Sequence, residues 1–433
     1  MTPRGTGRRS RDSVPEEASK RPVVAAIDMG YGHLRAALAL ADAFSVPLQR
    51  MEEAPLGDAT DARFWGRTRN LYEALTRFSQ LPAVSGPLGA LVRAITAIPP
   101  PWPARDRSGP TAGTRWMVRA AKSGAGARLA RHLRETGAPL VTTFYAAAIL
   151  AELHGATKLY CVVTDSDVNR VWAPPEPRKS KIRYFVPTEH ARRRLLSYGV
   201  LESNLRTTGF PLPDLLVGRD RSRLRMLLAS RLGRLAPREH LRARATADLG
   251  ALPSPSRPPL VVFAVGGAGA QIPLALRLVR GVAAEVKSER LQLALVAGRR
   301  EAAARAFQEA LREAGLEGHA GARILYDPDT LTYLRKFHQL LAEADALWSK
   351  PSELTFFAAL GLPFVCAPPV GVHEERNRRW AEEQGALLRQ HDPATAGGWL
   401  REWVEDGTLA RAAWSGYLHL PALGLYEIVD ELR

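Results

Sequence analysis

The sequence has 433 residues, 46% of them hydrophobic, and carries a formal net charge of +16. This length suffices for two or three domains with ordinary cores, and no run approaches the roughly 20 apolar residues that would span a bilayer. The two cysteines, Cys161 and Cys366, lie far apart in apolar runs, which excludes a disulfide framework and argues against a cysteine zinc site. The charge predicts attraction to polyanions, namely nucleic acid, anionic lipid or phosphorylated ligands, although a GC-rich genome would also raise the arginine content.

Residues 1–21 are basic and polar and contain no apolar core. We therefore expect a disordered tail and not a secretory signal, with the cytoplasm as the default compartment.

Short apolar runs then alternate with helical patterns along the chain. The apolar runs predict strands at 22–27, 139–144, 158–164, 182–187, 259–266, 291–298, 322–327, 344–349 and 362–368. The helical patterns lie at 33–44, 111–135, 144–153, 188–198, 271–287, 299–315, 330–343, 352–361 and 374–384. Such alternation is typical of parallel sheets covered by helices on both faces.

One basic stretch, residues 216–258, interrupts this series. It holds ten arginines against three acids and ends in the proline-rich LPSPSRPP. We interpret it as a helical insertion and linker between two α/β domains, 22–215 and 259–415. A last helix at 416–433 is expected to pack back on the first domain.

The first glycine turn reads IDMGYGH, where a predicted strand passes into a predicted helix. Gly30 and Gly32 allow positive φ and close approach of a ligand, and the helix offers free N–H groups and a partial positive charge. That dipole disfavours an imidazolium, so His33 is expected to stay neutral and able to act as a general base near pH 7. The alternative is a structural turn capped by a histidine.

A second glycine turn, VGGAGA, follows a strand in the second half and precedes a helix. It fits neither the dinucleotide fingerprint with its later acid nor a Walker loop. Gly266, Gly267 and Gly269 remain candidates for the close approach of a diphosphate.

The most informative stretch begins SKPSEL, directly after a predicted strand. Pro351 stands at the favoured first position of a predicted helix, so the amides of Ser352, Glu353 and Leu354 are expected to be free, with Lys350 just before them. Amides, helix dipole and ammonium together suit a diphosphate. Glu353 is either an acceptor for ribose hydroxyls or simply an acid stabilised in a first helical turn.

A further predicted helix follows PPVGVH and opens with Glu374, Glu375 and Asn377. These residues are either solvated caps or hydrogen-bond acceptors for the hydroxyls of a sugar ring.

In their order and spacing these motifs resemble the GT-B glycosyltransferases. The resemblance rests on the GxGH turn, on the segment KPSE…GLP…E..N, and on a series between them: Asp165 in VTD, then Trp172, then Tyr184 to Glu189 in YFVPTE, then Gly209 to Pro211. The pattern is most similar to the bacterial enzyme that adds N-acetylglucosamine to lipid I and to the monogalactosyl- and diglucosyl-diacylglycerol synthases. It covers residues 22–213 and 259–390.

This resemblance implies two Rossmann-like parallel-sheet domains facing each other across a cleft, the first binding an acceptor and the second a nucleotide-sugar donor. It implies catalytic roles for His33 and Asp165, either of which would be the base, and acceptor contacts at Gly30, Gly32 and Trp172. The donor contacts that it implies are Gly266, Gly267, Gly269, Lys350, Ser352, Glu353, Glu374, Glu375 and Asn377.

Three features depart from the family pattern and suggest a separate subfamily. Phe356 stands seven residues before the LP proline, where the family usually has a ribose-binding glutamate. The usual PGG after the lysine is PSE here, and the first turn, DMGYGH, has fewer glycines. Glu353, one turn earlier than the usual glutamate, is a candidate substitute.

The expected activity is inverting transfer of a sugar to a hydroxyl acceptor, with a UDP-sugar as the favoured donor. We expect no metal or cofactor, because the sequence has no ligand motif such as HExxH.

A membrane contact is also expected, at residues 84–102, which are apolar and end in an indole, and at 216–258. These segments would let the chain rest on the inner face of an anionic membrane, which suits a lipid acceptor; the alternative is a buried helix and a loop. Two other functions stay open, a nucleotide-sugar epimerase and a non-enzymatic polyanion-binding protein. Nucleic acid is not an expected partner, because the sequence shows none of the common nucleic-acid-binding motifs.

Overall fold

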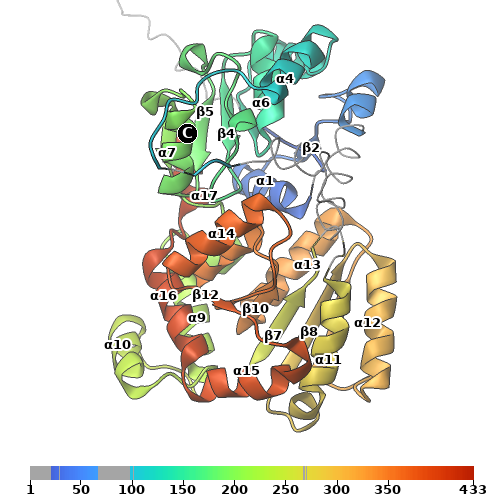
Figure 1. The fold of residues 1–433 in the computed structure, drawn as a ribbon, viewed down its shortest axis with the longest axis vertical. Helices are drawn as coiled ribbons and strands as arrows, with labels where there is room; N and C mark the ends of the chain where they lie inside the picture. Colours follow the sequence, from blue (N-terminus) through green and yellow to red (C-terminus); the bar gives the residue numbers. More distant parts are fainter. Residues whose placement is uncertain (1–20, 29, 67–97, 101, 267–268, 270) are drawn as a thin grey trace, which may run out of the picture.

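The computed structural model describes residues 21–28, 30–66, 98–100, 102–266, 269 and 271–433. They form two α/β domains stacked end to end, with the N-terminal domain above the C-terminal domain in Figure 1. The predicted tail and most of the predicted apolar segment at 84–102 lie outside the described residues, as does Gly267.

The N-terminal domain is built on a six-stranded parallel sheet in the order β2-β1-β3-β4-β5-β6. Its strands are β1 (Val23–Ala26), β2 (Leu48–Arg50), β3 (Leu140–Thr142), β4 (Leu159–Val162), β5 (Arg183–Val186) and β6 (Leu205–Thr207). Its helices are α1 (Tyr31–Phe44), α4 (Ala112–Lys122), α5 (Ala127–Thr136), α6 (Tyr145–Leu153) and α7 (Glu189–Ser197), with short 3₁₀ turns at Arg170–Trp172, Pro177–Lys179 and Glu202–Asn204.

The C-terminal domain has a second six-stranded parallel sheet, in the order β12-β11-β10-β7-β8-β9. Its strands are β7 (Leu260–Ala264), β8 (Gln292–Gly298), β9 (Ala322–Tyr326), β10 (Ala346–Ser349), β11 (Phe364–Cys366) and β12 (Leu387–Arg389). Its helices are α11 (Ile272–Lys287), α12 (Glu301–Glu313), α13 (Thr330–Glu343), the 3₁₀ helix η4 (Glu353–Leu360), α14 (Val372–Glu383), the 3₁₀ turn η5 (Pro393–Thr395), α15 (Ala396–Glu405) and α16 (Thr408–His419).

The central strands are the apolar runs that the sequence indicated. Every residue of β7 (LVVFA) and of β10 (ALWS) is buried, because helices cover both faces of a parallel sheet and leave no solvated side. The sequence did not indicate β2, β6 and β12. These are three-residue strands at sheet edges with partly exposed side chains, so they lack the long apolar run that marks a central strand.

The helical pattern at 111–135 is divided into α4 and α5, which corrects the prediction of one helix. Gly124 and Gly126 both have positive φ, at 99° and 79°. A Cβ at Gly126 would lie 2.7 Å from the Cβ of Leu150 on α6. The turn therefore lets two helices pack closely on α6, which one straight helix does not allow.

The basic stretch 216–258 is ordered and packs on the C-terminal domain. It continues the short helix α8 (Asp214–Val217) into α9 (Ser222–Arg234) and α10 (Glu239–Leu249), and α10 lies at the far side from the N-terminal domain in Figure 1. Arg231, buried in α9, donates to the carbonyl oxygens of Ala344, Leu360 and Gly361. Several arginines of this basic stretch therefore bond within the domain.

The chain ends in α17 (Gly424–Glu431), which lies against α1 of the N-terminal domain. A Cβ at Gly424 would lie 2.6 Å from the carbonyl oxygen of Gly209, and Arg206 pairs with Glu431 at 2.6 Å. The last helix therefore crosses back and ties the two domains together (Figure 1). No helix among the described residues is both long and apolar enough to cross a membrane.

Candidate functional site

The predicted residues gather at the carboxyl ends of the strands, at the point in each sheet where the strand order reverses. In the first sheet this point lies between β1 and β3, and in the second between β7 and β10. Open α/β sheets bind ligands at such switch points, because loops diverge there and leave a crevice. His33 follows β1, and Lys350 follows β10.

His33 bridges the first switch point. Its Nδ1 donates to the carbonyl oxygen of Thr143, just after β3, at 2.7 Å. A carbonyl only accepts, so the Nδ1 proton is in place and the neutral ring has its lone pair on Nε2. Burial lowers the pKa of His33, while Asp165 and the Thr143 carbonyl partly oppose this change. The lowered pKa favours the neutral imidazole near pH 7, and burial is its largest cause.

Asp165 and Trp172 complete the N-terminal side of the site. Asp165 follows β4, and its negative charge acts to raise the pKa of His33. The indole of Trp172 is buried, with its ring centroid 6.4 Å from that of His33 and 5.0 Å from that of Tyr145. Trp172 thus forms part of the aromatic wall beside the imidazole.

Gly266 and Lys350 meet at the second switch point. A Cβ at Gly266 would lie 2.5 Å from Cε of Lys350, so the lysine crosses the glycine turn at close range. Its ammonium forms an ion pair with Glu374 on α14, and Glu374 also accepts from the amide of Val370 at 2.7 Å. Burial opposes ionisation of Glu374, but Lys350 and His373 hold its pKa below the usual glutamate value.

The two switch points face each other and are joined by polar contacts. Asn377 of α14, fully buried, accepts from the amide of Ser166 at 2.8 Å and donates to Asp165 Oδ1 at 3.2 Å. Arg35 of α1 lies beside Glu353 of η4, with 3.4 Å between Nε and Oε1. The acceptor-side and donor-side candidates therefore belong to one interdomain site.

Two parallel-sheet domains that face each other through their switch points are diagnostic of one architecture. The chain has the GT-B fold. No family model matches the sequence.

A curated relative of this GT-B chain is the processive diacylglycerol beta-glucosyltransferase of Bacillus subtilis (strain 168), 23% identical over 229 residues. The match covers 52% of this chain and 49% of the relative, so the chain spans about half the length of the curated protein that it matches.

Solved structures that resemble the GT-B chain include two of nearly full coverage. UDP-GlcNAc 2-epimerase from Neisseria meningitidis, bound to UDP-GlcNAc, has a TM-score of 0.48 at 10% identity, with 94% of this chain and 98% of that chain covered. Acinetobacter baumannii MurG has a TM-score of 0.46 at 13% identity, with the same coverage.

Gly30 and Gly32 have different roles in this GT-B site. Gly30 is the N-cap of α1 with φ of 132°, a conformation that favours glycine. Gly32 lies within the helix and does not have positive φ, contrary to expectation. A Cβ there would come within 3.1 Å of Glu353 Oε2, so Gly32 provides room for a side chain of the opposite domain.

The start of η4 differs from the predicted helix N-terminus. The helix is 3₁₀ and begins at Glu353, which places Pro351 before its cap. The amide of Ser352 donates to the carbonyl of Lys350 at 2.8 Å, and that of Leu354 to Ser352 Oγ at 3.4 Å. These two amides are therefore engaged within the chain, so the prediction that they are free is wrong.

Glu353 and Glu375 have their contacts away from the second glycine turn. Glu353 points to Arg35 and Gly32 of the N-terminal domain, and Glu375 pairs with Arg378 and Arg379 of its own helix. Phe356, at the position of the usual family glutamate, is buried and stacks on Phe210 at 5.0 Å. Among the described candidates, Gly266, Gly269, Lys350 and Glu374 lie at or beside the second glycine turn.

Sequence reasoning missed Arg35 and a second interdomain contact. Arg35 is 1% exposed, with its guanidinium 4.7 Å from the Phe337 ring centroid. The amide of Arg299, just after β8, donates to the hydroxyl oxygen of Tyr31 at 3.1 Å, and its side chain pairs with Asp28 at 3.1 Å. Asp28 and Tyr31 belong to the first glycine turn, but no local pattern reveals their partner, which is 271 residues from Asp28 and 268 from Tyr31.

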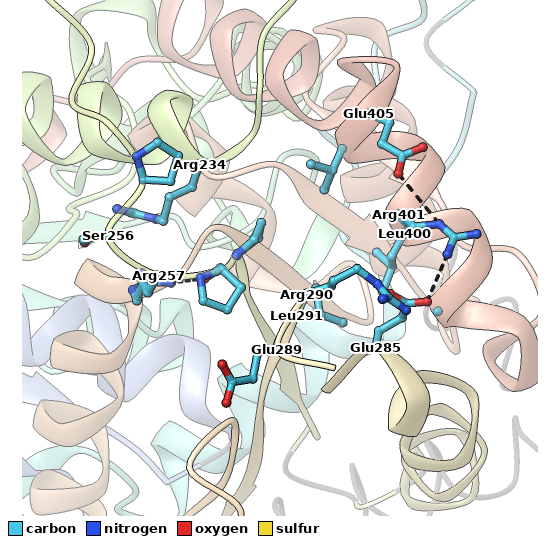
Figure 2. A pocket seen from close by; sticks show the side chains of 15 residues that line it. Arg234, Ser256, Arg257, Glu285, Glu289, Arg290, Leu291, Leu400, Arg401 and Glu405 are labelled. Carbon is cyan, nitrogen blue, oxygen red and sulfur yellow. Dashed lines mark hydrogen bonds and ion pairs between the residues drawn. The ribbon is translucent and has the colours of Figure 1, made fainter. Parts of the chain in front are cut away.

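A pocket of about 510 Å³ lies elsewhere in the C-terminal domain (Figure 2). Its wall includes Pro258, Pro259 and Leu291, which precede β7 and β8, so it opens at the amino ends of the strands. This is the opposite end of the sheet from Lys350, so the pocket is separate from the interdomain site. Its arginines are paired, for example Arg290 with Glu285 at 2.7 Å. Within the described residues no group of three or more His, Cys, Asp or Glu side chains is placed to hold a metal ion.

Proposed function

We propose that this protein is an inverting, metal-independent glycosyltransferase that moves a sugar from a nucleotide diphosphate donor, with UDP as the favoured nucleotide, to a hydroxyl acceptor. The observation that carries this proposal is the pairing of the two switch points. One presents His33 and Asp165, and the other presents Lys350 beside a glycine turn, across a single domain boundary. Such a boundary can hold two substrates in line and exclude water.

The acceptor half of the reaction needs a base. His33 Nε2 is placed to take the proton of the acceptor hydroxyl, because Nδ1 is already committed to Thr143. Asp165 would stabilise the imidazolium that forms, since its charge raises the pKa of His33 against the effect of burial. In the alternative assignment Asp165 takes the proton itself. In either case the acceptor oxygen forms the new bond to the anomeric carbon from the face opposite the diphosphate.

The donor half needs positive potential where the diphosphate leaves. As the bond between the anomeric carbon and the diphosphate oxygen breaks, the electron pair stays on the diphosphate. Lys350 is a cation beside the turn and would exchange its contact with Glu374 for this growing charge. Removing one such preorganised group typically costs about 3 kcal/mol of barrier, or ~100-fold in rate.

A lipid acceptor at an anionic membrane is a second part of the proposal. Helices α4 and α5 both pack on α6 and turn cations outward. Trp116 of α4, 41% exposed, adds an indole of the kind that settles at membrane interfaces. The exposed cations of the two helices are Arg115, Arg119, Lys122, Arg128, Arg131 and Arg134, against the single exposed acid Glu135.

Flotation with vesicles tests this membrane proposal. Vesicles of phosphatidylglycerol should bind the protein, and phosphatidylcholine vesicles should not. Reversing Arg119 and Arg131 to Glu should weaken binding at least about tenfold, since each cation contributes about 1 kcal/mol. The matched control reverses Arg242 and Arg244 of α10, which are also exposed. Equal losses in both variants would mean that net charge alone drives the binding.

A thermal-shift screen followed by product analysis tests the main proposal. UDP should stabilise the protein while ADP and NAD should not, because mass action favours the form that binds the ligand. UDP-sugars should then be consumed only when an acceptor alcohol is present. Turnover of the donor alone to an isomer would instead identify an epimerase, and no stabilisation by any nucleotide would contradict both activities.

A further inference from the structure

Asn377 makes the contact through which the C-terminal domain reaches the carboxylate beside His33. Its side chain is fully buried, and each end of its amide has a partner in the N-terminal domain. Oδ1 accepts from the amide of Ser166, and Nδ2 donates to Asp165 Oδ1. An amide whose two ends are both satisfied has one fixed orientation.

The loop that carries Asp165 is held by its own domain on the far side. Arg194 of α7 forms two hydrogen bonds of 2.8 Å to Asp167. The hydroxyl of Tyr198 donates to the carbonyl oxygen of Val168 at 3.0 Å. Contacts within the N-terminal domain therefore hold Asp167 and Val168, while the Ser166 amide and the Asp165 carboxylate are bonded to Asn377 of the other domain.

Helix α14 links the contact between Asn377 and Asp165 to the second glycine turn. Glu374 and Asn377 are three residues apart and lie on the same helix face. Glu374 holds Lys350 at the second switch point, and Asn377 holds Asp165, whose charge acts on His33 at the first. A shift of α14 would therefore change both contacts together.

We infer that Asn377 is a positioning residue, which orients the Asp165 carboxylate toward His33 and does so only when the two domains are closed on each other. The inference rests on the proposed function for its catalytic meaning. It assigns to Asn377 a role in the acceptor half, in place of the donor contact implied by the family pattern. The charged and titratable groups around Asp165, His33 and their loop are Asp167, Arg194, Glu353, His373 and Arg376.

The substitution Asn377→Asp tests whether Asn377 positions Asp165 or only attaches the two domains to each other. The new carboxylate keeps an acceptor for the Ser166 amide but no longer donates to Asp165, and it places a like charge beside it. We expect kcat to fall at least about tenfold, with the acidic limb of the pH–rate profile moved to higher pH and little change in acceptor KM. Asn377→Ala should lose kcat as well.

Asp42→Asn is the matched control, because Asp42 makes an exposed interdomain ion pair with Arg335 at 2.9 Å, far from the base. It should keep wild-type kcat. If Asn377→Asp keeps wild-type kcat and pH profile while Asn377→Ala is inactive, Asn377 only attaches the domains and the inference is wrong.

The titration of Asp165 can be measured without enzymatic activity, so it tests the role of Asn377 independently of the proposed function. The carboxyl carbon of Asp165 is followed by NMR during an acid titration, with Asp165→Asn providing the assignment. Losing a hydrogen bond to the charged form moves a carboxylate's titration to higher pH. An unchanged midpoint in both Asn377 variants would overturn the inference, whereas a raised midpoint in a protein that transfers no sugar would overturn the proposed function alone.

Discussion

Glu353 lies across the domain boundary from Arg35, with 3.4 Å between Oε1 and Nε, and the two side chains are 11% and 1% exposed. Arg35 also lies 4.7 Å from the ring centroid of Phe337 and 5.7 Å from that of Phe357. A guanidinium this deeply buried depends on its carboxylate partner, because an unpaired buried charge is costly.

Removing the carboxylate should therefore destabilise the whole chain. Glu353→Ala is expected to lower the free energy of unfolding by about 3–5 kcal/mol, since Arg35 remains buried without a counter-charge. The double variant Arg35→Met/Glu353→Leu should recover most of this loss, because apolar groups of similar size replace a buried ion pair at little cost. Urea denaturation of the three proteins measures both effects. A double variant no more stable than the single one would contradict this account.

Acid should weaken the fold through two buried histidines. Burial lowers the pKa of His33 and lowers that of His338 well below its usual value, with Arg35 adding to the effect on His338. The unfolded chain takes up protons near its ordinary histidine pKa of about 6.5, and the folded chain does so only at lower pH. The unfolded state thus binds more protons, so the free energy of unfolding decreases as pH falls below about 6.5.

His338→Phe should reduce this pH dependence. The phenyl ring can keep the stacking of His338 on Phe357, whose ring centroid is 6.3 Å away, and it takes up no proton. Urea denaturation at about pH 7.5 and at about pH 5 should give a smaller difference for the variant than for wild type. An identical difference would show that His338 is protonated equally in both states.

Lys350 and Glu374 should have opposite effects on nucleotide binding. Lys350→Met removes one cation beside the glycine turn and should weaken UDP binding about tenfold, the equivalent of about 1.4 kcal/mol. Glu374→Gln releases the ammonium from its present ion pair and should leave UDP affinity unchanged or raised. Calorimetric titration of both variants distinguishes the roles. Equal losses would mean that the pair acts as a structural unit.

Gly266→Ala should impair donor binding with little effect on folding. Its Cβ would lie 2.5 Å from Lys350 Cε, and the flexible end of the lysine would move away from the turn. The free energy of unfolding should change by no more than about 0.5 kcal/mol, while UDP affinity falls. Gly398→Ala, at an open and exposed site in α15, is the control and should add about 0.5–1 kcal/mol of stability without changing affinity. Loss of affinity in the control would invalidate the comparison.

The sequence by itself determined the alternation of buried strands and helices, and with it two parallel sheets. It also located the two glycine turns, since each follows an apolar strand directly. These features depend on residues close together in the chain, whose burial pattern is visible locally. The family resemblance implied that His33, Asp165 and Lys350 belong to one site, and each lies in the loop or helix start that comes after a strand.

Only the tertiary structure decided what those residues contact. Asp165 and Asn377 are 212 residues apart, and Arg35 and Glu353 are 318 apart. Glu353, Asn377 and Glu375 were all assigned to the donor, yet two of them face the other domain and the third pairs within its own helix. An acid in a first helical turn is stabilised by the helix dipole whatever it faces. Its partner is fixed only when two separately folded surfaces meet, because no local sequence pattern records the geometry of a contact between domains.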